Sequence, residues 1–202
     1  MPYRPMDPLS GALSRVAAAF EAVQVPFLIG GSLASSAHGV LRATMDVDIL
    51  AQIRDDQVAG LLAELGPDWY GDPKMIRDHL RASRAFNLIH QTSGQKFDIF
   101  PAVQPFHASE LERAAKIVFE FSDQRLTLPV ATAEDIILAK LQWYAAGGEI
   151  PERQWADITG ILATSPKIGI AYLRRWAIQL GVERLLDKAL AEALRADPPD
   201  GP

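Results

Sequence analysis

The sequence predicts an α/β (α+β) fold, in which a small mixed sheet flanked by helices is followed by a C-terminal helical module. Three observations lead to this class. An apolar run at residues 25–29 leads into two glycines, as a buried strand does before a helix. Between residues 86 and 129, short alternating segments are separated by turn residues, which is typical of hairpins. After residue 131 the apolar residues follow helical spacing.

In the first half of the chain, the predicted helices and strands alternate. A helical face of apolar residues covers 9–24, and Pro26 ends that helix and begins the first strand. A strand follows at 46–51, and a helix over 54–65 is stopped by a Gly-Pro pair. Residues 69–84 are ambiguous and partly helical. The two hairpins are predicted at 86–90 with 96–100, and at 117–121 with 125–129.

The second half is predicted to be helical. Thr132 resembles an N-cap, since two acidic residues follow it in the first turn of a helix that extends to about Ala146. Further helices are predicted at 151–164, 168–180 and 182–195. We therefore expect three parts: an α/β domain over 1–130, a helical module over 131–196 and a disordered tail over 197–202.

Composition excludes several functional classes. Cysteine is absent, so disulfides, thiolate metal sites and cysteine nucleophiles are ruled out. A net charge of −5 weighs against strong non-specific binding to nucleic acid, which depends on clustered Lys and Arg. The chain lacks a signal-peptide pattern and a long apolar run, so we expect a cytoplasmic protein without a membrane partner.

Two short motifs carry the candidate chemistry. Gly30, Gly31 and Ser32 join a strand to a helix N-terminus, where unpaired backbone N–H groups attract a phosphate. Asp46 and Asp48 are two residues apart, so on a strand both carboxylates face one side with their Cα atoms about 6.5–7 Å apart. That spacing allows two carboxylates to share one Mg²⁺ or to bridge two metal ions.

A third carboxylate is expected to join this pair. Asp98 lies on an otherwise apolar strand, where a carboxylate needs a partner, and a metal shared with Asp46 and Asp48 would supply one. Lys96 precedes Asp98 and could pair with it instead. We expect no direct contact between them, on the argument that strand alternation points neighbouring residues to opposite faces.

The order of these motifs resembles the nucleotidyltransferase fold, the superfamily that includes polymerase-β-like enzymes. The segments 133–141 and 153–158, together with Arg42 and Thr44 ahead of Asp46, are similar to motifs of its AbiEii/AbiGii-toxin-like branch. Members of that branch are known chiefly as toxins of bacterial toxin–antitoxin and phage-defence systems. The resemblance covers roughly residues 26–160.

The resemblance implies a role for each matching residue. Asp46, Asp48 and Asp98 would hold Mg²⁺ or Mn²⁺, and Asp98 would also help to deprotonate the acceptor. Lys140 would reach a phosphate and complete the catalytic set, although it could instead be a surface lysine extending past the core. The implied nucleotide-binding residues are Gly30, Gly31, Ser32, Arg42, Thr44 and Asp157. For Arg42 and Thr44 loop stabilisation is the alternative, and for Asp157 a structural contact between helices.

The implied activity is Mg²⁺-dependent transfer of a nucleoside monophosphate (NMP) from a nucleoside triphosphate (NTP) to an acceptor hydroxyl. The acceptor could be a tRNA 3′ end, a protein side chain or a small molecule such as an antibiotic, and a cognate antitoxin would be a partner. The alternative is a catalytically silent nucleotide-binding module that acts as an antitoxin or regulator. A third interpretation is a phosphohydrolase that uses the same metals with water as the acceptor.

Overall fold

The computed structural model describes residues 8–40, 46–148, 152–165 and 167–195. The chain divides into two compact units. Unit 1 comprises Met1–Gly30 with Ala43–Val130, and unit 2 comprises Gly31–Arg42 with Ala131–Pro202. The short segment after Gly30 therefore groups with the C-terminal helices. Division into a 1–130 domain and a 131–196 module stays a prediction, and the tail at 197–202 lies outside the described residues.

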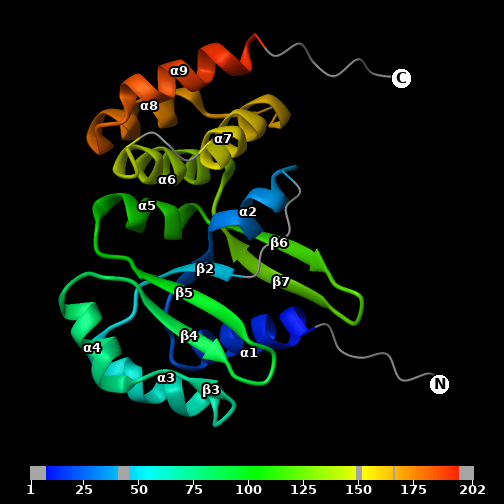
Figure 1. The fold of residues 1–202 in the computed structure, drawn as a ribbon, viewed down its shortest axis with the longest axis vertical. Coiled ribbons are helices and arrows are strands. Elements are labelled where there is room, and N and C mark those ends of the chain that lie inside the picture. Colours follow the sequence, from blue (N-terminus) through cyan, green and yellow to red (C-terminus); the bar gives the residue numbers. More distant parts are fainter. Residues whose placement is uncertain (1–7, 41–45, 149–151, 166, 196–202) are drawn as a thin grey trace. The chain divides into compact units, whose positions relative to one another are not determined.

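Unit 1 is built on a seven-stranded mixed sheet of order β3-β4-β5-β2-β1-β7-β6 (Figure 1). Two of its pairings, β2 with β5 and β1 with β7, are parallel, and the other four are antiparallel. The predicted α/β class and both predicted hairpins are confirmed. The strands are β1 (Phe27–Ile29), β2 (Asp46–Ala51), β3 (Trp69–Tyr70), β4 (Phe86–His90), β5 (Gln95–Pro101), β6 (Ala115–Glu120) and β7 (Arg125–Val130).

Alternation along β2 and β5 separates a core face from a polar face. Val47 and Ile49 of β2 are fully buried, as are Phe97 and Ile99 of β5, so these side chains form the core face. The residues between them point to the opposite face, which carries the acidic side chains. Leu13, Val16 and Phe20, on the apolar face of α1 (Pro8–Ala22), are also fully buried.

The helices of unit 1 include one that sequence patterns did not predict. This is α5, which begins at Pro105 just after Gln104, its N-cap residue. His107 accepts backbone N–H bonds from Val103 and Gln104 at 3.1 and 3.3 Å, so a ring nitrogen caps the helix start in place of the usual side-chain oxygen. The helical elements are α1 (Pro8–Ala22), the 3₁₀ turn η1 (Asp55–Gln57), α3 (Val58–Leu65), α4 (Pro73–Arg81) and α5 (Pro105–Arg113).

Unit 2 is entirely helical in its described part. The predicted cap of α6 is confirmed, because Thr132 Oγ1 accepts from the Asp135 N–H at 3.3 Å. The short helix α2 packs on α6, which also contacts α7 and α8, and α9 packs on α7 and α8. Its helices are α2 (Gly31–Ala37), α6 (Ala133–Ala146), α7 (Glu152–Thr164), α8 (Ile170–Leu180) and α9 (Glu183–Ala193). Among the described residues of either unit, we find no helix with the length and apolar character needed to span a membrane.

Candidate functional site

The register of β2 and β5 brings three carboxylates together on the polar face of the sheet. The parallel pairing sets Asp48 directly beside Asp98. Asp46 lies two positions before Asp48 on the same strand, so its side chain points to the same face. Residues separated by fifty positions in the sequence therefore become neighbours.

Lys96 joins this cluster, and the expectation that it would not contact Asp98 was wrong. Its ammonium Nζ lies 3.0 Å from Asp98 Oδ2 and 3.4 Å from Asp46 Oδ2. The physical reason is simple: Lys96 and Asp98 are two residues apart on β5, not adjacent, and positions two apart share a face. The hydrogen bond to Asp98, together with the charges of both carboxylates, raises the pKa of Lys96 against the opposing effect of burial.

The cluster is partly open to solvent. The Asp46 side chain is 51% exposed, that of Lys96 35% and that of Asp98 19%. A further polar residue, which sequence reasoning missed, lies on the same face: Asn87 of β4 is the register partner of Asp98 and is exposed. The sequence does contain a pattern that could have predicted this position, because Asn87 lies between two apolar residues of its strand, Phe86 and Leu88, which are buried.

The donor set suits a hard divalent cation. Carboxylate oxygens are preferred ligands of Mg²⁺ and Mn²⁺. In this structure the ammonium of Lys96 is the positive charge between the carboxylates of Asp46 and Asp98. In the described part of the chain, no group of three or more His, Cys, Asp or Glu side chains is arranged to hold a metal ion as it stands. The residues therefore fit a metal by their chemistry, and binding would require the ammonium to move.

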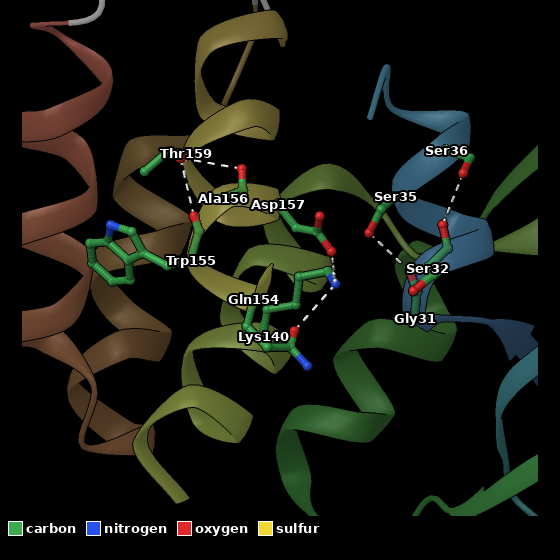
Figure 2. A network of polar contacts seen from close by, with 10 residues as sticks. All are labelled: Gly31, Ser32, Ser35, Ser36, Lys140, Gln154, Trp155, Ala156, Asp157 and Thr159. Atoms are coloured by element: carbon green, nitrogen blue, oxygen red, sulfur yellow. Dashed lines mark hydrogen bonds and ion pairs between the residues drawn. The ribbon is translucent and has the colours of Figure 1, made fainter. Parts of the chain in front are cut away.

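The glycine turn differs in part from expectation. The Gly30 N–H donates to the Asp48 carbonyl at 2.9 Å, extending the β1–β2 pairing, so this N–H does not face an anion. Gly31 begins α2 with a φ of 58°, a left-handed conformation that favours glycine. The hydroxyls of Ser35 and Ser36 donate to the carbonyls of Gly31 and Ser32 at 3.0 and 3.1 Å (Figure 2).

A second polar cluster lies within unit 2, between α6 and α7. Lys140 Nζ donates to Asp157 Oδ2 at 2.7 Å and to Gln154 Oε1 at 3.3 Å (Figure 2). Lys140 and Asp157 thus form a contact between the two helices. Both side chains are only 7% exposed, so the alternative of a surface lysine is wrong. Figure 2 shows the ammonium on the side of α6 that faces α2.

The predicted site residues therefore fall into two groups. Unit 1 holds the three carboxylates and Gly30, and unit 2 holds Gly31, Ser32, Lys140 and Asp157. Arg42 and Thr44 lie outside the described residues. The nucleotide-binding and catalytic roles of all these residues stay predictions.

Comparison with known proteins supports the fold. No protein-family model matches the chain. No curated protein matches it either. A crystal structure of an antigenic nucleotidyltransferase-like protein from Paracoccidioides brasiliensis superposes with a TM-score of 0.51 at 17% identity, over 96% of this chain and 95% of that chain. The fold is therefore nucleotidyltransferase-like.

Two structures of ANT(2″)-Ia give weaker matches. One, a solution structure described as an antibiotic-resistance factor, has a TM-score of 0.48 at 19% identity over 94% of this chain and 97% of that chain. The other, in complex with adenylyl-2″-tobramycin, has a TM-score of 0.49 at 16% identity over 91% and 98% of the two chains. Likeness at this level does not inform the activity of this chain.

Proposed function

We propose that this protein is a nucleotidyltransferase that transfers an NMP group from an NTP to an acceptor hydroxyl with the help of Mg²⁺ or Mn²⁺. One observation carries the proposal: the strand register sets Asp48 beside Asp98, with Asp46 on the same face, in a nucleotidyltransferase-like fold. Transfer of a phosphoryl-type group depends mainly on positioning and on neutralising charge. Carboxylates on two rigid neighbouring strands suit that task.

Each residue would then have a defined part. A divalent cation bound by the three carboxylates would neutralise phosphate charge and align the triphosphate. Asp98 would accept the proton of the acceptor hydroxyl, whose oxygen forms a bond to the α-phosphorus of the NTP while the bond to the β-phosphate breaks and pyrophosphate leaves. On α2, Gly31 and Ser32 would contact the terminal phosphates. Lys140 would supply a positive charge to a phosphate, held in place by Asp157.

The acceptor and the biological role belong to the same proposal. The acceptor would be a tRNA 3′ end or a protein side chain, and the resemblance of the motifs to the AbiEii branch supports the role of a cytoplasmic toxin paired with a cognate antitoxin. A small-molecule hydroxyl is the other acceptor class. Arg42 and Thr44 would contribute to phosphate binding.

The test is incubation of the full chain with each α-labelled NTP, Mg²⁺, and either total tRNA or lysate, with the labelled product identified afterwards. Asp48→Asn should lower transfer by about 10²–10³-fold or more, because the site loses one of the carboxylates that would hold the metal ion against the phosphates. Asp56→Asn is the matched control. Asp56 is an exposed acid of η1 that pairs with Arg54 and lies on neither strand of the cluster, so this variant should keep full activity. Unchanged transfer by Asp48→Asn would refute the assignment.

One observation favours a second candidate, a catalytically silent nucleotide-binding module. The positively charged Lys96 already contacts two of the three carboxylates, as a residue replacing the metal would do. This candidate predicts that calorimetry detects binding of an NTP while product analysis finds no transfer with any acceptor. Labelled product from the wild-type chain would exclude it.

A further inference from the structure

We propose that Lys96 is a tethered cation that occupies the carboxylate cluster in the metal-free protein, and that a divalent cation binds this cluster in competition with its ammonium. The inference rests on the proposed function, since it takes Asp46, Asp48 and Asp98 as the metal site. It goes further by assigning Lys96 a role in setting the strength of metal binding.

The first step is the position of the ammonium. Lys96 lies on β5 and contacts one carboxylate of its own strand, Asp98, and one of the neighbouring strand, Asp46. A single positive charge thus links the two strands that carry the proposed ligands. A metal ion bound by the same carboxylates would meet this charge at contact distance.

The second step is electrostatic. Three carboxylates on one face of two adjacent strands repel one another, and a cation placed among them relieves this repulsion. Lys96 supplies that cation when no metal is present. An ammonium and a divalent ion repel each other at the same place, so the metal binds fully only when Lys96 withdraws.

The third step is that Lys96 is able to leave. Its side chain is 35% exposed, and a lysine carries its charge at the end of a flexible four-carbon chain. In water the ammonium exchanges the two carboxylates for solvent at little loss, as exposed ion pairs generally do. Arginine at this position would hold both carboxylates through its planar fork and would be harder to displace.

The experiment measures Mn²⁺ binding directly, by electron paramagnetic resonance and calorimetry on the metal-stripped full chain without nucleotide. Lys96→Met keeps the length of the side chain and removes its charge. It should bind Mn²⁺ up to about fivefold more tightly, because the metal no longer has to displace a partly exposed ion pair, whose contribution is small. Lys96→Arg should bind Mn²⁺ no more tightly than the wild type.

Arg81→Met is the matched control, because Arg81 also bridges two acids, Asp55 at 3.2 Å and Asp78 at 3.3 Å, outside the cluster. It changes the net charge equally and should leave Mn²⁺ affinity unchanged. Adding Asp98→Asn to Lys96→Met should remove the gain. Lys96→Gln, which also lacks the charge, replaces Lys96→Met if that variant folds poorly.

The outcomes separate this inference from the proposed function. Tighter Mn²⁺ binding by Lys96→Met without NMP transfer by any form of the chain would support the inference and count against the function. Transfer by the wild type would support the function, and equal Mn²⁺ affinity of Lys96→Met and the wild type would then count against the inference alone. Equal or weaker Mn²⁺ binding by Lys96→Met and Lys96→Gln, including no binding by any form, overturns the inference.

Discussion

Two lysine–aspartate contacts of the same chemistry lie in opposite environments in this chain. In unit 1, the Lys96 side chain is 35% exposed and its partners Asp46 and Asp98 are 51% and 19% exposed. In unit 2, Lys140 and Asp157 are each 7% exposed. Water can replace either partner in the first contact, whereas in the second each charge depends on its neighbour. The comparison teaches that solvent exposure determines which lysine can leave its carboxylate.

The same difference separates their proposed tasks. A lysine that exchanges with a metal has to be released at little loss of free energy, and a lysine that presents a fixed charge has to be held. Gln154 adds a second acceptor to the buried Lys140 and fixes it further. The predictions below test whether the two contacts differ as their environments require.

The largest effect is expected at the buried pair. Lys140→Met leaves the Asp157 carboxylate buried without its 2.7 Å partner, so the free energy of unfolding should fall by about 3–5 kcal/mol. Urea unfolding followed by circular dichroism measures this fall. Replacing both residues, as in Lys140→Met with Asp157→Leu, should restore most of the stability, because no charge is then left buried. A Lys140→Met variant with an unchanged urea midpoint would contradict this expectation.

A smaller effect is expected where the two units join, at adjacent glycines. Gly31→Ala places a side chain at φ 58° and should lower the free energy of unfolding by about 1–2 kcal/mol. Gly30→Ala is the control, because its added Cβ would meet the Asp48 carbonyl oxygen at an ordinary 3.8 Å, and its effect should stay within about 0.5 kcal/mol. Equal losses in the two variants would mean that the left-handed backbone of Gly31 is not the cause.

The exposed contact should contribute less still. In the presence of EDTA, Lys96→Met should lower the free energy of unfolding by no more than about 1 kcal/mol, as expected for a partly exposed ion pair. In 1 M NaCl this difference should shrink further, because the screening length falls to about 3 Å. The Lys140→Met difference should persist in the same salt. If urea unfolding shows that 1 M NaCl reduces the stability loss of Lys96→Met and of Lys140→Met equally, the two contacts do not differ in their exposure to solvent as proposed.

The smallest effect concerns His107 at the start of α5. Burial lowers the pKa of His107 below its ordinary 6.5, partly offset by a hydrogen bond to the Pro101 backbone. The unfolded chain therefore binds more protons below pH 6.5, and stability should fall as the pH drops from 6.5 towards the folded-state pKa. His107→Asn keeps a hydrogen-bond acceptor without titrating, so the wild type should lose more stability than this variant over that range. Parallel pH profiles would contradict the expectation.

Local patterns were sufficient for most individual elements. Alternation predicts the strands at 46–51 and 96–100 and the face of their carboxylates, and the capping pattern at Thr132 predicts the start of α6. The helix α5 was not predicted because its N-cap residue is a glutamine and the acceptor at its start is a histidine ring nitrogen, in place of a Ser, Thr, Asp or Asn side chain. The contact of Lys96 with Asp98 could have been predicted from their spacing of two residues.

The sequence by itself determined which residues form strands and helices and which of their side chains point away from the core, since these features depend on local periodicity and on caps. Only the tertiary structure decided that β2 pairs with β5 in parallel, so that Asp48 meets Asp98 with Lys96 against Asp46. It also decided that Lys140 and Asp157, on separate helices, are buried together. Register and burial arise from the packing of distant segments, and no local pattern encodes them.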